Sequence, residues 1–163
     1  MESSPNISSV YRAGHLDAFF KELRQEAEGL WTGYWPSDMA NLSALIYHNF
    51  PDINWCGFYI LDPATQKLRL GPFQGKVACV EIPVGKGVCG HAVKTKLSVL
   101  VEDVHLFAGH IACDAASRSE LVVPIGQGNI IGVLDIDSPL VNRFSIKDQL
   151  GFEALVNFDW KIN

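Results

Sequence analysis

Apolar residues recur with a helical period at both ends of the chain. Residues 15–30 and 37–50 each carry apolar side chains at helical spacing, which predicts two helices, and Ser37 is a candidate N-cap for the second. Residues 145–160 show the same spacing after Ser145, another candidate cap, which predicts a C-terminal helix. Helices are therefore expected on both sides of the middle of the chain.

The middle of the chain changes to short apolar runs separated by turn-forming residues, which is typical of strands joined by hairpins. A short helix is expected over residues 87–97, and residues 105–117 form a long irregular stretch of a kind that often carries function. This order predicts an α+β domain with about six strands in a mainly antiparallel sheet and helices packed against it. The predicted strands cover residues 53–61, 67–73, 76–84, 98–104, 119–125 and 130–137.

Length and charge narrow the class of protein. A chain of 163 residues suits a single domain over residues 1–163, with the first dozen residues a tail or part of the first helix. The net charge of −5 and the lack of a Lys/Arg cluster argue against a nucleic-acid partner. No apolar run approaches the roughly 20 residues that cross a bilayer, and the N-terminus lacks the pattern of a secretion signal. We therefore expect a cytoplasmic protein with no membrane partner.

Four cysteines are the first candidates for chemistry, and in a reducing compartment they are expected to be thiols. Cys113 lies in GHIACD, with a histidine three residues before it and an aspartate directly after it. Cys89 lies in GKGVCG, in the first turn of the expected helix, where backbone amides are expected to lower the pKa of a thiol. Cys56 and Cys79 fall in predicted strands. Core packing, metal binding and redox chemistry are all possible for this set.

The cysteine and glycine motifs also match two other kinds of site, a dinucleotide-binding loop and a zinc site. The glycines of GKGVCG match the spacing of a dinucleotide-binding loop, but hairpins surround them instead of repeated βαβ units, so a tight turn into a helix is favoured. Cys89, His91, His110 and Cys113 are residue types that bind zinc, although the usual closely spaced cysteine pair is missing. We therefore expect neither a dinucleotide nor a metal.

Three carboxylates are expected on one patch of the last predicted hairpin. Asp135 and Asp137 stand two residues apart and so point to the same face of a strand. If the turn GQGN pairs Ile125 with Ile130, Glu120 falls opposite Asp135. Like charges in such positions destabilise a sheet, and at least one of their pKa values is expected to be raised. The patch is either a solvated face or, as its apolar neighbours favour, a site for a cationic ligand or a held proton.

Aromatic and apolar residues alternate along the first predicted strand. Cys56, Phe58 and Ile60 share one face, which is expected to be core. Trp55 and Tyr59 share the opposite face, where they either fill the core or form the wall of a pocket. The sequence leaves these two interpretations of the aromatic pair open.

Three stretches of the chain resemble a known family, and they are LGPFQGKVACVEIPVGKGVCGHAV, DVHLFAGHIACDAASRSELVVPI and GVLDIDSP. They are similar to the free methionine-(R)-sulfoxide reductases, which are GAF-domain enzymes. The resemblance runs from the second predicted helix to the C-terminal helix. Most GAF domains are ligand sensors and lack this set of cysteines. The resemblance implies a single GAF domain with an enzymatic pocket.

The resemblance also implies roles for individual residues. Cys113 corresponds to the catalytic nucleophile, Cys79 to the resolving cysteine that pairs with it, and Cys89 to an auxiliary cysteine that exchanges into their disulfide. His110 and Asp114 are candidates to orient the nucleophile. The residues that correspond to the substrate site are the carboxylates Glu120, Asp135 and Asp137 and the aromatic residues Trp55 and Tyr59.

The implied reaction is the thiol-dependent reduction of free L-methionine (R)-sulfoxide to L-methionine, without a cofactor. It proceeds through a sulfenic acid on Cys113 and an intramolecular disulfide, which thioredoxin reduces. One of the three acids is expected to protonate the sulfoxide oxygen, and the sequence does not assign which one. The resemblance further implies a homodimer, with the N-terminal helix as a candidate interface. The alternative function is a GAF sensor that binds a small ligand without converting it.

Overall fold

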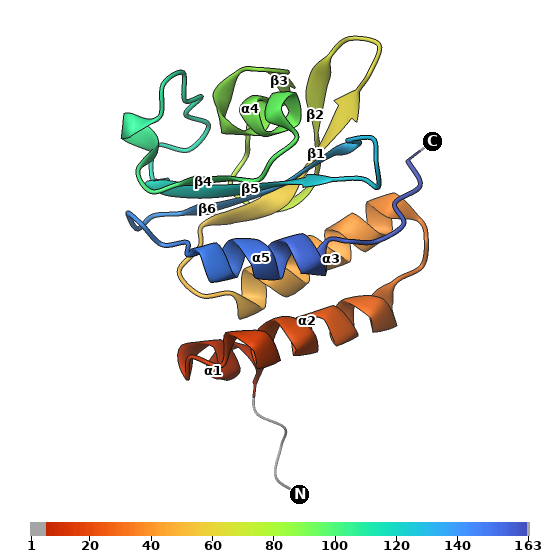
Figure 1. Cartoon of the computed structure of the whole chain (residues 1–163), viewed down its shortest axis with the longest axis vertical. Coiled ribbons are helices and arrows are strands. Elements are labelled where there is room, and N and C mark those ends of the chain that lie inside the picture. The colour runs from red at the N-terminus through yellow and green to blue at the C-terminus, as the bar shows by residue number, and fades with distance from the viewer. Residues whose placement is uncertain (1–5, 163) are drawn as a thin grey trace, which may run out of the picture.

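Six strands form one antiparallel sheet in the computed structural model, which describes residues 6–162 (Figure 1). Their order across the sheet is β3-β2-β1-β6-β5-β4, and each neighbouring pair is antiparallel. The predicted α+β class and antiparallel sheet are confirmed. The strands are β1 (Trp55–Asp62), β2 (Lys67–Gly75), β3 (Glu81–Pro83), β4 (Val99–Val101), β5 (Ser119–Ile125) and β6 (Gly132–Ser138).

Five α-helices cover the two faces of this sheet unequally. On one face α3 and α5 pack directly on the strands, and α1 and α2 form an outer layer over them; α4 lies on the other face (Figure 1). Within residues 6–162, no helix is long and apolar enough to cross a membrane. The helices are α1 (Ile7–Arg12), α2 (Leu16–Leu30), α3 (Trp35–Asn49), α4 (Gly87–Thr95) and α5 (Ile146–Leu155), with a 3₁₀ turn η1 (Val104–Leu106).

The start of α3 differs from the predicted one. The helix begins at Trp35, so Ser37 lies inside its first turn and is not the N-cap. The side chain of Asp38 reaches back from the helix and accepts hydrogen bonds from the backbone N–H groups of Thr32 and Gly33. An acid within the first turn thus fixes the preceding loop, which is a role that the Ser37 prediction did not include.

The two terminal helices match the prediction in part. Ser145 is the N-cap of α5 as predicted, and it forms a capping box with Asp148, but the helix ends at Leu155, before the predicted end. Residues 7–12, predicted as a tail or as part of the first helix, form the separate helix α1. Residues 1–5 lie outside the described part of the chain.

The β5–β6 hairpin has a different register from the predicted one. Glu120 lies opposite Asp137 and not opposite Asp135. The predicted register assumed a four-residue turn, whereas the connection runs through residues 126–131. The difference shifts the pairing by two residues, and because side chains alternate with a period of two, all three carboxylates stay on the same face.

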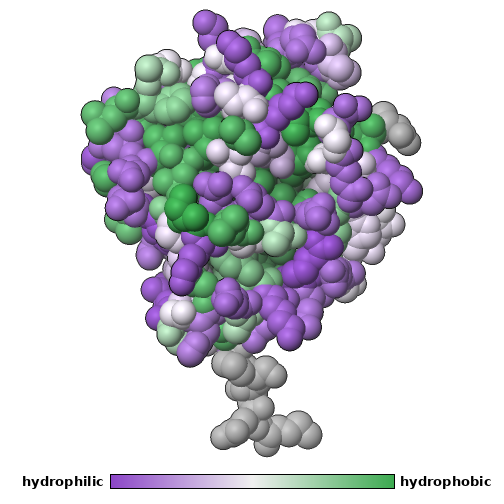
Figure 2. Space-filling view, viewed as in Figure 1, coloured by the Kyte–Doolittle hydropathy of each residue, from purple (hydrophilic) through white to green (hydrophobic). Residues whose placement is uncertain are grey.

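The sheet separates two hydrophobic clusters. On the face covered by α3 and α5, called the helical face, Cys56, Phe58 and Leu134 join a large apolar core. On the opposite face, called the α4 face, Trp55 and Tyr59 belong to a second, smaller cluster. The predicted alternation along β1 is confirmed, with Trp55 and Tyr59 on the opposite face from Cys56 and Phe58. Figure 2 shows hydrophilic residues over most of the lower, helical part of the molecule and more hydrophobic ones around the upper part.

Candidate active site

A pocket opens on the α4 face, between α4 and the loop that follows η1. It encloses about 520 Å³ of empty space, counting the part that is open to solvent. The pocket brings together the three kinds of residue that the sequence singled out. Its lining includes the cysteines Cys89 and Cys113, the carboxylates Glu120, Asp135 and Asp137, and the aromatic residues Trp55 and Tyr59.

A disulfide joins Cys113 in this lining to Cys79. The two residues are 34 apart in sequence, and their Cα atoms are 5.5 Å apart. Cys113 is exposed and Cys79 is half-buried, so the bond is open to attack from solvent. Residues 76–80, which carry Cys79, were predicted as part of a strand but are irregular, and the strand is confined to β3. The disulfide is the pairing that the resemblance implies.

The aromatic pair on β1 anchors the segment that carries Cys79. The hydroxyl of Tyr59 donates a hydrogen bond of 2.9 Å to the backbone carbonyl of Cys79, and the indole Nε1 of Trp55 donates one of 3.0 Å to the carbonyl of Lys76. The Trp55 ring stacks with the ring of Tyr59 and with the ring of Phe73. Both aromatic residues are buried and both line the pocket. They therefore fill the core, wall the pocket and hold the disulfide segment at once.

The carboxylates Glu120, Asp135 and Asp137, called the acid cluster, form the floor of the pocket. Glu120 and Asp135 are each 6% exposed, whereas Asp137 is half-buried. Burial raises the pKa of Glu120 and of Asp135 well above the usual range, and the charges of neighbouring acids raise them further. The pKa of Asp137 is also raised, first by loss of water contact and then by Asp135 and Asp114. The predicted rise is confirmed, and the cluster holds protons at a pH where free carboxyls have lost them.

One oxygen of the acid cluster has no hydrogen-bond partner. The atom Oδ1 of Asp135 is buried and unpaired within the described residues. Among residues 6–162, no lysine or arginine forms an ion pair with the cluster, and the basic side chain beside it is His110, whose Nε2 lies 3.5 Å from an oxygen of Glu120. Because an unpaired buried acceptor is costly, a cationic or hydrogen-bond-donating ligand at this point is energetically favoured.

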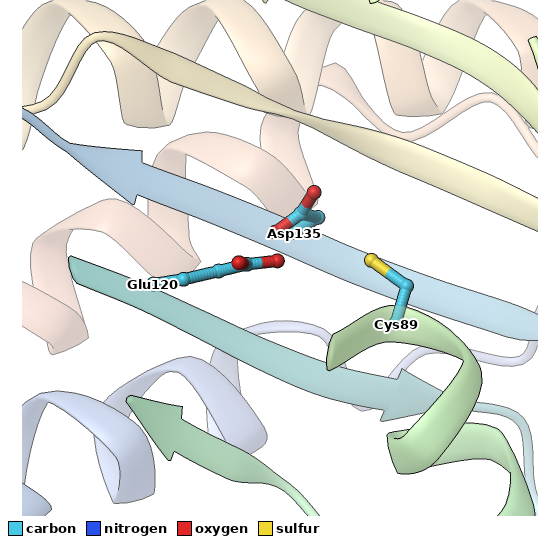
Figure 3. Close-up of side chains that lie close together, drawn as sticks. All are labelled: Cys89, Glu120 and Asp135. Carbon is cyan, nitrogen blue, oxygen red and sulfur yellow. The ribbon is translucent and has the colours of Figure 1, made fainter. Parts of the chain in front are cut away.

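Cys89 lies in the first turn of α4 as predicted, but the expected effect on its thiol is wrong. The residue is 3% exposed, and burial raises its pKa well above the usual value, with further contributions from Asp135, Glu120 and Asp137. The helix N-terminus favours a thiolate by a small amount only, because its partial charge acts against burial and three acidic neighbours. Figure 3 shows the thiol pointing from α4 toward Glu120 and Asp135.

Within the described residues, the four residues considered as possible zinc ligands, Cys89, His91, His110 and Cys113, do not form one group of ligands. Cys113 is bonded to Cys79, so it offers no thiolate, and His91 is exposed on α4. The group of possible ligands is instead Cys89 with Glu120 and Asp135, whose ligating atoms lie within 4.8 Å of one another. Two of the three residues in that group are the acids of the pocket floor, so it belongs to the pocket itself.

The glycines of GKGVCG serve the entry into α4. Gly87 has φ +60°, and a side chain there would meet Ile111, which lies in the loop that carries Cys113. A side chain on Gly90 would collide with the backbone carbonyl of Pro83 at the end of β3. The motif thus brings α4 close to β3 and to the cysteine loop. The interpretation as a turn into a helix is confirmed, and the antiparallel sheet lacks the βαβ unit of a dinucleotide site.

The loop that carries Cys113 is fixed by residues that the sequence analysis missed. Asn54, just before β1, donates hydrogen bonds from its side-chain amide to Asp114 at 3.4 Å and to the hydroxyl of Ser117 at 3.2 Å. Asp114 also accepts a bond of 2.9 Å from the backbone N–H of Ala116. Asp114 therefore holds the loop directly after Cys113, and His110 contacts the acid cluster. No spacing in the sequence links Asn54 to a loop sixty residues away.

Comparison with known proteins finds related sequences over the whole of this site. The profile of the GAF domain family matches residues 38–158, which include every pocket residue named above. The free methionine-R-sulfoxide reductase of Escherichia coli (strain K12) is 52% identical over 141 residues, which cover 85% of this chain and 84% of that protein. The free methionine-R-sulfoxide reductase of Saccharomyces cerevisiae is 46% identical and covers 85% of this chain and 82% of that protein.

A solved structure is similar over the same region. The X-ray structure of free methionine-R-sulfoxide reductase from Neisseria meningitidis, in complex with its substrate, superposes with a TM-score of 0.82 at 39% sequence identity. The match covers 85% of this chain and 84% of that one. The sequence comparisons and the structure comparison therefore find members of the same family.

Proposed function

The chain belongs to the GAF-domain family and to its free methionine-R-sulfoxide reductases, and from this premise we propose that it reduces free methionine (R)-sulfoxide to methionine through Cys113. One observation carries the proposal: a single pocket places Cys113, which is bonded to Cys79 in a disulfide, beside a buried acid cluster. The cysteines supply two electrons, and the acids supply a proton and a negative charge. A sulfoxide of a free amino acid needs both.

The first step is attack by the thiolate of Cys113 on the sulfoxide sulfur. The sulfoxide oxygen gains a proton from the acid cluster as its bond to sulfur breaks, because a protonated oxygen leaves more readily. The hydroxide that leaves then attacks the sulfur of Cys113 and breaks the bond between that sulfur and the substrate sulfur. Methionine is released, reduced by two electrons, and Cys113 becomes a sulfenic acid that carries the oxygen. The raised pKa values of Glu120, Asp135 and Asp137 support this step, since each of them retains a proton at higher pH than an ordinary acid.

The second step regenerates the enzyme in two stages. The thiol of Cys79 attacks the sulfenic sulfur of Cys113, releases water and forms the disulfide. A dithiol, for which we propose thioredoxin, then reduces that disulfide by exchange. The reducing compartment that this exchange requires is the cytoplasm in our proposal. Exchange of Cys89 into the disulfide and assembly into a homodimer stay predictions, and light scattering of the purified protein measures the second.

Binding of a free amino acid follows from the acid cluster. The ammonium group of free methionine sulfoxide matches the unpaired oxygen of Asp135, and it balances the charge of an ionised acid in a cluster that forms no ion pair with a lysine or arginine within residues 6–162. A methionine within a peptide has no such ammonium. The aromatic rings of Trp55 and Tyr59 provide an apolar wall for the methyl end of the substrate. We expect an N-acetylated, amidated methionine sulfoxide to be turned over at least ~100-fold less efficiently, since a buried acid is then left without its cation.

The experiment that tests the proposal is turnover with thioredoxin, thioredoxin reductase and NADPH. Resolved R and S forms of free methionine sulfoxide are compared, together with the blocked analogue and the variant Cys113→Ser. Consumption of NADPH with the R form only, absent in the variant, is the expected result. No turnover by protein with reduced thiols would refute the proposal and leave a ligand-sensing GAF domain as the alternative.

A further inference from the structure

Cys89 is placed unlike the two cysteines of the disulfide. Those lie in irregular segments with access to solvent, whereas Cys89 is 3% exposed and lies on a helix packed against the sheet. Its thiol points into the acid cluster (Figure 3), where its sulfur and the nearest oxygens of Glu120 and Asp135 lie within 4.8 Å of one another. The thiol of Cys89 lies close enough to the carboxyl of Asp135 for a hydrogen bond between them to change the pKa of both groups. Its position suits contact with the acids and not with an external reductant.

The acids around Cys89 disfavour a thiolate and outweigh the small opposite effect of the helix N-terminus. Glu120 faces the thiol from β5, and Asp135 and Asp137 face it from β6, while the uncharged phenol of Tyr59 lies nearby on β1. Burial acts in the same direction as the acids on the pKa of the thiol. His110, the nearby base, lies against Glu120, and burial lowers the pKa of its imidazole, which favours the uncharged form. Because the thiolate is the species that takes part in disulfide exchange, Cys89 is poorly suited to that chemistry.

We infer that Cys89 is a positioning residue of the substrate site, which donates a hydrogen bond from its protonated thiol to Asp135 and does not enter the redox cycle. The inference rests on the proposed function for its kinetic consequences and revises the role that the resemblance implied. The donor acts on the acid that also carries the unpaired buried oxygen. It therefore helps to decide whether Asp135 is ionised when the substrate ammonium arrives.

The direction of this effect follows from the opposing influences on Asp135. Burial and the neighbouring Glu120 raise the pKa of Asp135, whereas the hydrogen bond from Cys89 lowers it. Removing the donor leaves the raising influences unopposed, so the ionised form is reached only at higher pH. Binding of a cationic substrate at neutral pH then weakens, while the reacting cysteines are unchanged.

The kinetic test compares Cys89→Ala with Cys89→Ser, using dithiothreitol as reductant so that docking of a protein reductant plays no part. In Cys89→Ala we expect KM for free methionine (R)-sulfoxide to rise roughly 3- to 10-fold, the worth of one hydrogen bond, with kcat changed less. The acidic limb of the kcat/KM profile moves to higher pH. Cys89→Ser keeps a hydroxyl donor and recovers most of the loss in both measurements.

Two kinetic results overturn the inference. One is a Cys89→Ser enzyme as impaired as Cys89→Ala, with the Cys79–Cys113 disulfide accumulating during turnover, because that identifies a redox role. The other is an unchanged KM and pH profile in Cys89→Ala. If the wild-type protein shows no turnover, the proposed function is refuted instead. The role of Cys89 as a hydrogen-bond donor is then tested by spectroscopy alone.

The spectroscopic test needs no turnover. In the oxidised protein the free cysteines are Cys56 and Cys89, both buried, and Cys56 lies in the apolar core of the helical face as an internal control. The S–H stretching band that disappears in Cys89→Ser is expected at lower frequency than the band of Cys56. Asp135→Ala removes the acceptor and should shift the Cys89 band toward that of Cys56. Coincident bands in the wild type, or a Cys89 band unmoved in Asp135→Ala, contradict the hydrogen bond.

Discussion

The two faces of one sheet divide the molecule into a part that stabilises the fold and a part that presents chemistry. Neighbouring residues of β6 illustrate the division, because Leu134 is fully buried in the apolar core of the helical face while Asp135 lies in the acid cluster of the α4 face. The helical face buries apolar side chains against α3 and α5. The α4 face buries acids and a thiol against one short helix and loops.

The difference shows that burial alone does not identify a structural core. Both faces exclude water, but on the helical face burial is favourable, at about 25 cal/mol per Å² of apolar surface. On the α4 face burial of Glu120 and Asp135 opposes folding, since each acid loses its hydration without a compensating cation. In the proposed function, the ammonium group of the substrate supplies the positive charge that these two acids lack.

The sharpest way to separate the faces is to replace one cysteine on each. Cys113→Ser removes the proposed nucleophile and should lower kcat/KM by about 10⁴-fold or more, because no other group takes its place. Cys56→Ser places a hydroxyl in the apolar core and should cost ~1–3 kcal/mol of the free energy of unfolding with kcat/KM retained. Steady-state kinetics and urea unfolding of both variants make the comparison. Equal losses of activity would contradict the division.

A second comparison uses adjacent residues of β6. Asp135→Asn should lower kcat/KM roughly 10²- to 10⁴-fold, since it removes an acid that binds or protonates substrate. Its free energy of unfolding should not fall, because an uncompensated buried acid is removed. Urea unfolding and kinetics measure the two effects. A marked loss of stability in Asp135→Asn would show that the acid supports the fold.

The matched change on the helical face is Leu134→Ala. Truncation of this fully buried side chain should cost ~2–5 kcal/mol of the free energy of unfolding, from lost burial and the cavity that remains. The folded fraction should keep a kcat/KM close to that of the wild type. Activity measured per folded molecule, at a temperature below the unfolding transition, provides the check. A specific loss of kcat/KM would mean that the helical face shapes the pocket.

The acid cluster should also make stability fall as pH rises. The pKa values of Glu120 and Asp135 are raised in the folded protein, so above about pH 4, where unfolded carboxyls ionise, the folded state holds more protons than the unfolded state. The free energy of unfolding then decreases by up to ~1.4 kcal/mol per pH unit for each such acid, until its folded pKa is reached. Urea unfolding between pH 5 and 8 should give a shallower decline for Asp135→Asn. Parallel curves would contradict the raised pKa.

The smallest effect is expected at a helix cap outside the pocket. Ser145→Ala removes the side chain that accepts a hydrogen bond from the N–H of Asp148 and should cost ~1 kcal/mol of stability. Turnover should be unchanged, since α5 packs on the helical face. Thermal unfolding and steady-state kinetics of the variant test both statements. A change in kcat/KM would link the two faces through the sheet.

The sequence predicts much of this division but not its details. Alternation along β1 assigns Phe58 and Tyr59 to opposite faces, and alternation along β6 assigns Asp135 and Asp137 to one face, because side chains of a strand alternate with a period of two whatever its register. The register of β5 against β6 depends on the six-residue connection between them. The residues GQGN alone do not predict the length of this connection.

The pKa of Cys89 on α4 could not be predicted from the sequence, because it depends on neighbouring acids on β5 and β6. A helix N-terminus is visible in the sequence, whereas burial beside Glu120 and Asp135 arises only when the chain has folded. Likewise, the anchoring of the cysteine loop by Asn54 has no signal in the sequence. Local sequence patterns therefore predict which residues share a face of a strand and where a helix begins. The pKa values and loop contacts of the site depend on tertiary contacts.

The central claim is that this pocket reduces free methionine sulfoxide and oxidises Cys113 and Cys79 in doing so. A single-turnover experiment tests it most directly. Fully reduced protein, freed of reductant, is mixed with one equivalent of free methionine (R)-sulfoxide, and methionine and the cysteine pairing are measured by mass spectrometry. We predict one methionine per chain and a Cys79–Cys113 disulfide, with no disulfide in Cys113→Ser. Protein that binds the compound but forms neither methionine nor the disulfide would contradict the account.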